Sequence, residues 1–120
     1  MIYDIEVTDE FGEWFRALAE DDADAVAARV ELLAEGGPNL KGPVIGEIRN
    51  SQHAPRMKEL RCGTTGAIRV LFCFDPLRTA ILLLGGTKAG RWDEWYRQSI
   101  PQADRLYEVY LEELKKEGLL

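Results

Sequence analysis

Apolar and polar residues alternate at the start of the chain. Tyr3, Ile5 and Val7 are separated by acidic residues, so they share one side of an extended segment. Strict alternation is typical of a half-buried strand, because successive side chains point to opposite faces. The pattern predicts a strand over residues 2–7.

The hydrophobic period then becomes helical. Thr8 or Asp9 can cap a first helix, and Asp21 and Asp22 break its apolar stripe and cap a second. The second helix is expected to end at residues 36–38, Gly-Gly-Pro. The two segments predict a helical hairpin. Its apolar stripes are Phe11, Trp14, Phe15, Leu18 and Ala19 in the first helix, and Val26, Val30, Leu33 and Ala34 in the second.

The second half of the chain has strand patterns. Residues 37–56 show little periodicity, and we expect a long ordered loop with about one helical turn there. Short strand-like segments follow over 57–61, 67–74 and 79–84, separated by turn sequences, which predicts an antiparallel meander. The tail carries a helical apolar stripe, and Pro101 suits the first turn of that helix.

This order of elements predicts an α+β fold with an N-terminal strand and helical hairpin, an antiparallel β-meander and a C-terminal helix. The chain has 120 residues and no linker or repeat, so we expect a single domain over residues 1–120. No apolar run approaches the ~20 residues of a membrane helix. The N-terminus also lacks the basic and apolar regions of a signal peptide. We therefore expect a cytoplasmic protein with no membrane partner.

Charge is distributed unevenly along the chain, whose net charge is −6. Residues 1–36 contain eleven acids and two bases, residues 37–100 ten bases and five acids, and residues 101–120 three bases and five acids. A basic patch is the electrostatic footprint of an RNA-binding face, and the total charge can hide it. A mixed, solvated surface is the alternative interpretation.

Metal chemistry has few candidate ligands in this sequence. There is one histidine, His53, and two cysteines, Cys62 and Cys73, without a CxxC spacing. A zinc site needs about four ligands, so we expect no metal and no cofactor. We expect Cys73 in the core, Cys62 as a free thiol near a turn and no disulfide between them. His53 is expected to be exposed and non-catalytic.

The most specific pattern lies between residues 57 and 88. It combines MKELR at 57–61, AIRVLFCFD at 67–75 and ILLLGGTK at 81–88. This pattern resembles the RelE/ParE superfamily of toxins from type II toxin–antitoxin systems, and within it the HigB-like branch. The resemblance covers almost the whole chain. It implies a RelE-like microbial RNase fold and a ribosome-dependent mRNA endonuclease that inhibits translation.

The resemblance also implies partners and alternatives. It implies a cognate helix-turn-helix antitoxin, together with the ribosome and mRNA, and no small-molecule cofactor. One alternative is a toxin of the ParE type, which binds and poisons DNA gyrase without cleaving RNA. Another is a relative that only binds its partner. The basic middle of the chain favours the endonuclease over this last alternative.

RNA cleavage by a 2′-hydroxyl needs a base, cations that stabilise charge on phosphorus, and an acid for the leaving 5′ oxygen. Without clustered histidines or carboxylates, these roles fall to Lys, Arg and Tyr. The resemblance points to Arg61, Arg69 and Lys88 as catalytic residues, and Tyr96 or Lys58 is a candidate for proton transfer. A hairpin between 57–61 and 67–74 would bring both arginines to one sheet face. The protein would then be a metal-independent endoribonuclease.

Three further residues are candidates for RNA binding: Lys58, Arg91 and Trp92. Strand alternation points Lys58 away from Arg61, whereas Glu59 falls on the same side as Arg61. Residues 90–96, GRWDEWY, replace the lysines and threonines that the family usually has there.

Each candidate also has a structural interpretation. Trp92 and Trp95 can stack on RNA bases or fill the core beneath the last helix. Arg69 can be a structural arginine bonded to that helix, and Lys88 a solvated turn residue. Arg78, in the turn at 75–78, is expected to be merely solvated.

Overall fold

The computed structural model describes residues 2–63, 67–87 and 91–120. The α+β class and the expected order of elements are confirmed. In chain order the elements are β1 (Asp4–Val7), α1 (Asp9–Arg16), α2 (Glu20–Gly36), the 3-10 turns η1 (Gly37–Asn39) and η2 (Gly42–Val44), β2 (Ile45–Glu47), β3 (Met57–Cys62), β4 (Ile68–Phe74), β5 (Thr79–Gly86) and α3 (Trp92–Lys116). Within the described residues, none of the helices has both the length and the apolar character needed to cross a membrane.

The strands form one five-stranded sheet in the order β1-β5-β4-β3-β2. The expected meander is present, because β3, β4 and β5 pair antiparallel to one another. β1 lies parallel to β5, with Ile5 opposite Ala80. The segment predicted to be a loop contains an additional strand, β2, which pairs antiparallel with β3. With only three residues, β2 is too short for alternation to be recognisable.

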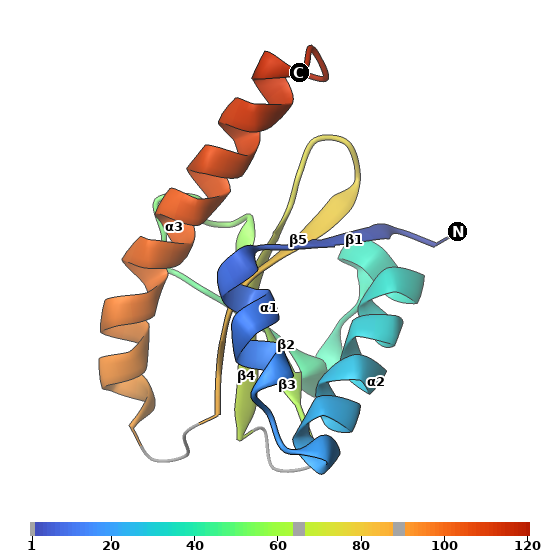
Figure 1. Ribbon diagram of the computed structural model, residues 1–120, viewed down its shortest axis with the longest axis vertical. Coiled ribbons are helices and arrows are strands. Elements are labelled where there is room, and N and C mark those ends of the chain that lie inside the picture. The colour runs from blue at the N-terminus through green and yellow to red at the C-terminus, as the bar shows by residue number, and fades with distance from the viewer. Residues whose placement is uncertain (1, 64–66, 88–90) are drawn as a thin grey trace.

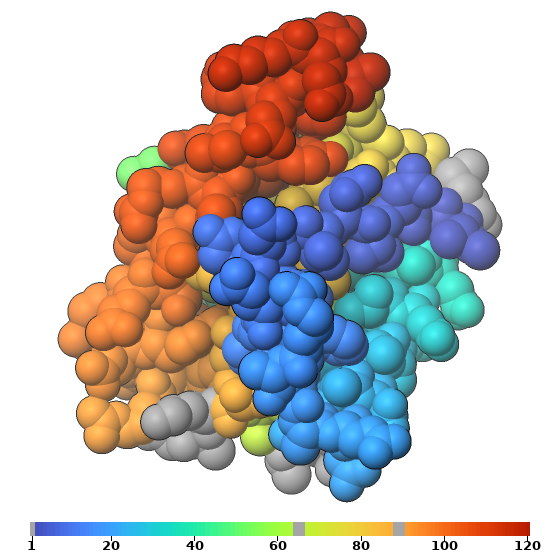
Figure 2. All heavy atoms as spheres, in the orientation of Figure 1, coloured from blue at the N-terminus to red at the C-terminus, as the bar shows by residue number. Residues whose placement is uncertain are grey.

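The helices cover the two faces of the sheet separately (Figure 1). On one face, residues of α1 and α2 such as Phe11 and Leu33 pack into a core with Leu60. On the other, α3 packs through residues such as Tyr107 on Met57. In the space-filling view of Figure 2, α3 runs along the side of the molecule away from α2. The sheet therefore separates the acidic helical hairpin from α3.

The N-termini of the first two helices differ in how they are capped. Thr8 caps α1 as expected, since its Oγ1 accepts a hydrogen bond from the backbone N–H of Phe11 at 3.0 Å. The predicted cap at Asp21 or Asp22 was wrong. α2 begins at Glu20, and its N-cap residue makes no side-chain capping bond. The acids instead lie in the first turn, where the helix dipole favours negative charge.

α3 begins earlier than the sequence suggested. It starts at Trp92, so Pro101 lies inside the helix and not in its first turn. Pro101 has no N–H to donate to the carbonyl of Arg97, four residues earlier, which weakens the helix locally. Trp95 and Ile100 pack on the core beneath α3. Tertiary burial of this kind, more than local propensity, is what usually stabilises helices in proteins.

The turn between β4 and β5 is tied to the N-terminal segment. Arg78 adopts a positive φ of 69°, and its Nη2 donates a hydrogen bond to Tyr3 Oη at 2.7 Å. Its guanidinium carbon also lies 4.8 Å from the centre of the Tyr3 ring. The expectation that Arg78 is merely solvated was therefore wrong. Arg78 reaches Tyr3 because β1 pairs in parallel with β5, which places the residue before β1 next to this turn.

Candidate functional site

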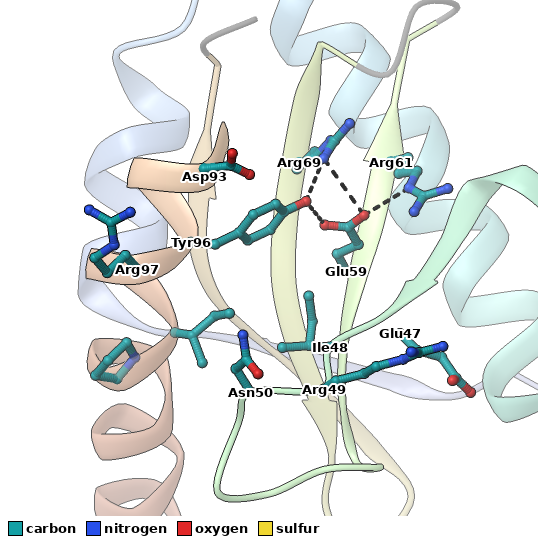
Figure 3. Close-up of a pocket in the computed structure, with 12 residues that line it drawn as sticks. Glu47, Ile48, Arg49, Asn50, Glu59, Arg61, Arg69, Asp93, Tyr96 and Arg97 are labelled. Carbon is teal, nitrogen blue, oxygen red and sulfur yellow. Dashed lines mark hydrogen bonds and ion pairs between the residues drawn. The ribbon is translucent and has the colours of Figure 1, made fainter. Parts of the chain in front are cut away.

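A pocket of about 610 Å³ lies between the sheet and the first turns of α3 (Figure 3). Sites for small ligands in proteins typically enclose about 300–1,000 Å³. Side chains reach this pocket from β3, β4, α3 and the segment that begins at the end of β2. The lining residues are Glu47, Ile48, Arg49, Asn50, Glu59, Arg61, Arg69, Asp93, Tyr96, Arg97, Ile100 and Pro101.

Arg61 and Arg69 lie directly opposite each other on β3 and β4. Directly paired residues of an antiparallel ladder share one face of the sheet, so both arginines project toward α3. The hairpin expected from the sequence therefore brings these two candidates together. Like charges placed directly opposite each other are destabilising, and an anion is needed nearby to compensate.

Glu59 supplies that anion. Its side chain is only 3% exposed, and its Oε2 accepts a hydrogen bond from Arg61 Nε at 2.8 Å. The same oxygen lies 4.0 Å from Arg69 Nη1. Buried charges are stable in proteins when they are paired in this way. The bond uses Nε of Arg61, whose side chain remains 41% exposed, so this guanidinium is both fixed by Glu59 and accessible to an anion.

Tyr96 completes the cluster from α3. Its hydroxyl donates a hydrogen bond to Glu59 Oε1 and accepts one from Arg69 Nη1 at 2.5 Å. Burial, followed by the bond to Glu59, raises the pKa of Tyr96 to about 12. The phenol therefore keeps its proton at neutral pH, and that proton is directed at Glu59. Figure 3 shows these four side chains converging from β3, β4 and α3.

Two tryptophans at the start of α3 have different environments. The Arg69 guanidinium carbon lies 4.5 Å from the centre of the Trp92 ring, a cation–π contact. Trp95 packs on the core beneath α3. A Cβ atom at Gly86, the residue opposite Arg69 on β5, would lie 2.6 Å from the Trp95 ring. The core role is confirmed for Trp95. Trp92 contacts Arg69, and its stacking on RNA bases stays a prediction.

Other candidates lie outside the pocket or outside the described residues. Lys58 points away from Arg61, as alternation indicated, and its Nζ lies 3.9 Å from Glu47 Oε1. Arg91 is exposed just before α3 and forms an ion pair with Glu94 at 2.9 Å. Lys88 lies outside the described residues, so its place relative to the cluster is not part of the structure.

His53 and the cysteines also lie outside the pocket. His53 Nε2 contacts Glu108 Oε2 at 3.0 Å, which ties the segment before β3 to α3. Cys62 and Cys73 are buried free thiols in the two separate cores. Burial raises the pKa of each thiol to about 12, which disfavours the reactive thiolate. No group of three or more His, Cys, Asp or Glu in the described part of the chain is arranged to hold a metal ion.

The sequence did not identify every residue of the pocket. The sequence identified Glu59 only as a neighbour of the arginines. Its burial could have been predicted, because strand alternation places Glu59 on the same face as the apolar residue Met57. Arg49 and Asn50 lie in a segment without periodicity, and Arg97 follows the run at 90–96. Their convergence depends on how α3 packs on the sheet, which local patterns do not encode.

Solved structures with a similar fold include RelE toxins. A mutant of the E. coli toxin RelE in the free state matches with a TM-score of 0.62 and 14% identity, over 85% of this chain and 98% of RelE. A chain of the toxin–antitoxin complex RelBE2 from Mycobacterium tuberculosis matches with a TM-score of 0.57 and 17% identity, over 73% of this chain and 100% of that one. The protein therefore has the RelE toxin fold.

Sequence comparisons place the chain more narrowly. A model of the family described as "Phage derived protein Gp49-like (DUF891)" matches residues 13–108. The putative toxin HigB3 of Mycobacterium tuberculosis is 48% identical over 98 residues, which cover 82% of this chain and 84% of HigB3. The putative toxin HigB2 of the same organism is 43% identical over 100 residues, which cover 82% of this chain and about half, 49%, of HigB2. The chain belongs to the Gp49-like family of RelE/HigB-type toxins.

Proposed function

We propose that the protein is the toxin of a type II toxin–antitoxin system and that it inhibits translation by cleaving mRNA on the ribosome. The observation that carries this proposal is the cluster of Arg61, Arg69, Glu59 and Tyr96 in the pocket. It combines two cations with a proton-transfer pair, which is what phosphodiester cleavage by a neighbouring hydroxyl requires. The similarity to HigB2 and HigB3 supports the same class of activity.

The two arginines bind the scissile phosphate in this proposal. Arginine offers planar, bidentate donors that match phosphate oxygens, and its charge does not depend on pH. Glu59 fixes Arg61 and Tyr96 fixes Arg69, so both guanidinium groups are oriented before the substrate arrives. Such preorganised donors stabilise the charge that develops on phosphorus without reorganising during the reaction.

Proton transfer follows the hydrogen bond between Tyr96 and Glu59. The 2′-hydroxyl gives its proton to Tyr96 Oη while the phenolic proton moves to Glu59 Oε1. The 2′ oxygen forms a bond to phosphorus, the bond from phosphorus to the 5′ oxygen breaks, and the leaving oxygen takes a proton from water. The products are a 2′,3′-cyclic phosphate and a 5′-hydroxyl end. Glu59 then returns its proton to solvent through Tyr96.

Other residues complete the proposal. Lys88, which lies outside the described residues, stays a candidate catalytic cation, and Trp92, Arg91 and Lys58 stay candidates for contact with RNA. Trp92 offers the ring face that single-stranded bases stack on. No metal is needed, because arginines supply the positive charge. The partner is a cognate antitoxin with a helix-turn-helix domain, in line with the toxin–antitoxin complexes among the similar structures.

The proposal is tested with purified protein and ribosomes programmed with a defined mRNA. We expect cleavage of ribosome-bound mRNA, no cleavage of the same RNA free in solution, and a cyclic phosphate end on the upstream fragment. Activity should persist at a chelator concentration that leaves the ribosomes intact. A specific requirement for added manganese or zinc would overturn the metal-independent mechanism, and intact mRNA throughout would overturn the endonuclease.

A further inference from the structure

The pocket extends well beyond the cluster that the proposed cleavage uses. Figure 3 shows Ile48 and Asn50 at the end of the pocket away from the cluster, with Arg97 of α3 on one side of them and Arg49, which extends toward Glu47, on the other. Ile48 and Ile100 are 7% and 6% exposed, and with Pro101 they give this end an apolar lining. A scissile phosphate and its 2′-hydroxyl need only the cluster, so this half of the pocket is available to another part of the substrate.

The polar groups at this end suit a nucleotide. Asn50 carries an amide that can both donate and accept hydrogen bonds, as the edges of nucleobases do. Arg49 follows β2 and Arg97 lies on α3; both are exposed, and neither forms an ion pair with another described residue. Among the lining residues of the whole pocket, four arginines stand against three carboxylates. Of these carboxylates, Glu59 is paired within the cluster, Glu47 lies near Lys58, and Asp93 lies on α3 one turn before Arg97.

The wall that carries Arg49 and Asn50 is fixed to α3 by a buried carboxylate. Asp104 is 4% exposed. Its Oδ1 accepts a hydrogen bond from Ser51 Oγ at 2.5 Å and its Oδ2 accepts one from the backbone N–H of Gln52 at 3.0 Å. The residues directly before Ser51 are therefore held against the helix that carries Arg97. Such fixation lowers the entropy lost when a ligand binds.

We propose that this end of the pocket is a subsite for one nucleoside next to the scissile phosphate. The inference rests on the proposed endonuclease and adds a determinant of its sequence preference. The base lies against Ile48, Ile100 and Pro101, Asn50 reads its edge, and Arg97 holds the adjoining phosphate. Asp104 is a positioning residue, which acts only through the wall that it holds.

The test measures cleavage of ribosome-bound mRNAs that vary at the positions around the cut. Asn50→Ala is expected to flatten the preference among bases at one position, because the edge contact carries the discrimination. Arg97→Gln is expected to raise the half-saturating toxin concentration about tenfold for all sequences, because a phosphate contact carries no base information. Its single-turnover rate at saturation should change little. Arg105→Gln, an exposed arginine of the same helix that does not line the pocket, is the matched control.

A third variant tests the wall itself. Asp104→Asn keeps the size of the side chain and removes one acceptor from the pair that holds Ser51 and Gln52. We expect it to combine both defects, and melting curves show whether it still folds. The subsite is overturned if Asn50→Ala keeps the wild-type base preference and Arg97→Gln behaves like Arg105→Gln. If the wild-type protein cleaves no mRNA at all, the proposed function fails instead, and the two failures are thereby distinguished.

Discussion

A buried carboxylate organises the candidate site at the scale of single residues. An anion beside an RNA phosphate is unfavourable unless its charge is compensated. Both oxygens of Glu59 accept hydrogen bonds, one from Arg61 and one from Tyr96, and Arg69 lies close by. The carboxylate therefore orders the cations and remains available as the final acceptor of a proton from Tyr96.

The proton relay predicts that Glu59 and Tyr96 act as a unit. We expect Glu59→Gln and Tyr96→Phe each to lower the single-turnover rate on ribosomes about 10²- to 10⁴-fold, the usual size of general acid–base catalysis. The double variant should lose little more than either single one, since groups that act together are non-additive. Fully additive losses would contradict the relay. Glu59→Gln also removes the negative charge that offsets the repulsion between Arg61 and Arg69. Melting curves show whether this repulsion destabilises the variant.

Arg69 gives a second prediction at this scale. Arg69→Ala removes a charge-assisted contact worth about 1.5–3 kcal/mol, so cleavage should fall roughly ten- to a hundredfold and growth inhibition should be relieved. Arg105 is an exposed residue of α3, so Arg105→Ala should change the free energy of unfolding by less than about 0.5 kcal/mol and leave toxicity unchanged. Arg105 is a better control than Arg78, which is bonded to Tyr3.

Loss of toxicity by Arg69→Ala has two explanations, since a misfolded toxin is also harmless. Melting and capture by the antitoxin separate them. If the variant melts at a much lower temperature and no longer binds the antitoxin, Arg69 is a structural arginine that bonds to α3. A variant that folds, binds the antitoxin and still inhibits growth places Arg69 outside the site.

At the scale of elements, the short strand β2 depends on a glycine to accommodate the cluster. Gly46 lies opposite Glu59 in the ladder. A Cβ atom there would lie 2.6 Å from Arg61 Nη2 and 2.7 Å from Glu59 Oε2. We expect Gly46→Ala to displace Arg61, to reduce cleavage at least tenfold and to destabilise the protein by about 1–3 kcal/mol, as overpacking does.

A glycine in α1 provides the matched control for Gly46→Ala. At Gly12 the nearest atom to an added Cβ is the flexible end of Arg16, at 3.2 Å. Gly12→Ala should therefore raise the melting temperature, because alanine favours a helix interior by about 1 kcal/mol, and should leave cleavage unchanged. Equal activity of Gly46→Ala and Gly12→Ala would show that the position of Arg61 does not matter.

Elements with a long periodic pattern were predictable from the sequence, and short or interrupted ones were not. The hairpin of α1 and α2 and the meander of β3, β4 and β5 follow from apolar stripes and turn residues. β2 has too few residues to alternate, and Pro101 masks the true start of α3 at Trp92. The parallel pairing of β1 with β5 joins residues far apart in sequence, so no local pattern specifies it.

At the scale of the whole molecule, the sheet separates the most acidic helices of the chain from the arginines of the pocket. The acidic helices α1 and α2 lie on one face of the sheet and α3 lies on the other (Figure 1). The pocket with its arginines is on the α3 face, between the sheet and that helix (Figure 3). Arg61 and Arg69, to which the family motif points, both line the pocket because they are paired on neighbouring strands. Arg49 and Arg97 come together with them only when α3 packs on the sheet, so the sequence alone left the pocket incomplete.

This separation of charge leads to the final prediction, which concerns the target in the cell. An arginine-lined pocket suits RNA phosphates, and the acidic hairpin on the other face is repelled by the phosphates of the ribosome, which orients the pocket inward. Expression without the antitoxin should therefore stop methionine incorporation within minutes, before thymidine incorporation falls. Pulse labelling after brief induction measures both, with Arg69→Ala as the inactive comparison. An early fall in thymidine incorporation while translation continues would instead identify DNA gyrase as the target, as for a toxin of the ParE type. In that case the Tyr96–Glu59 pair would have a structural role, because a toxin that acts on gyrase deprotonates no RNA 2′-hydroxyl.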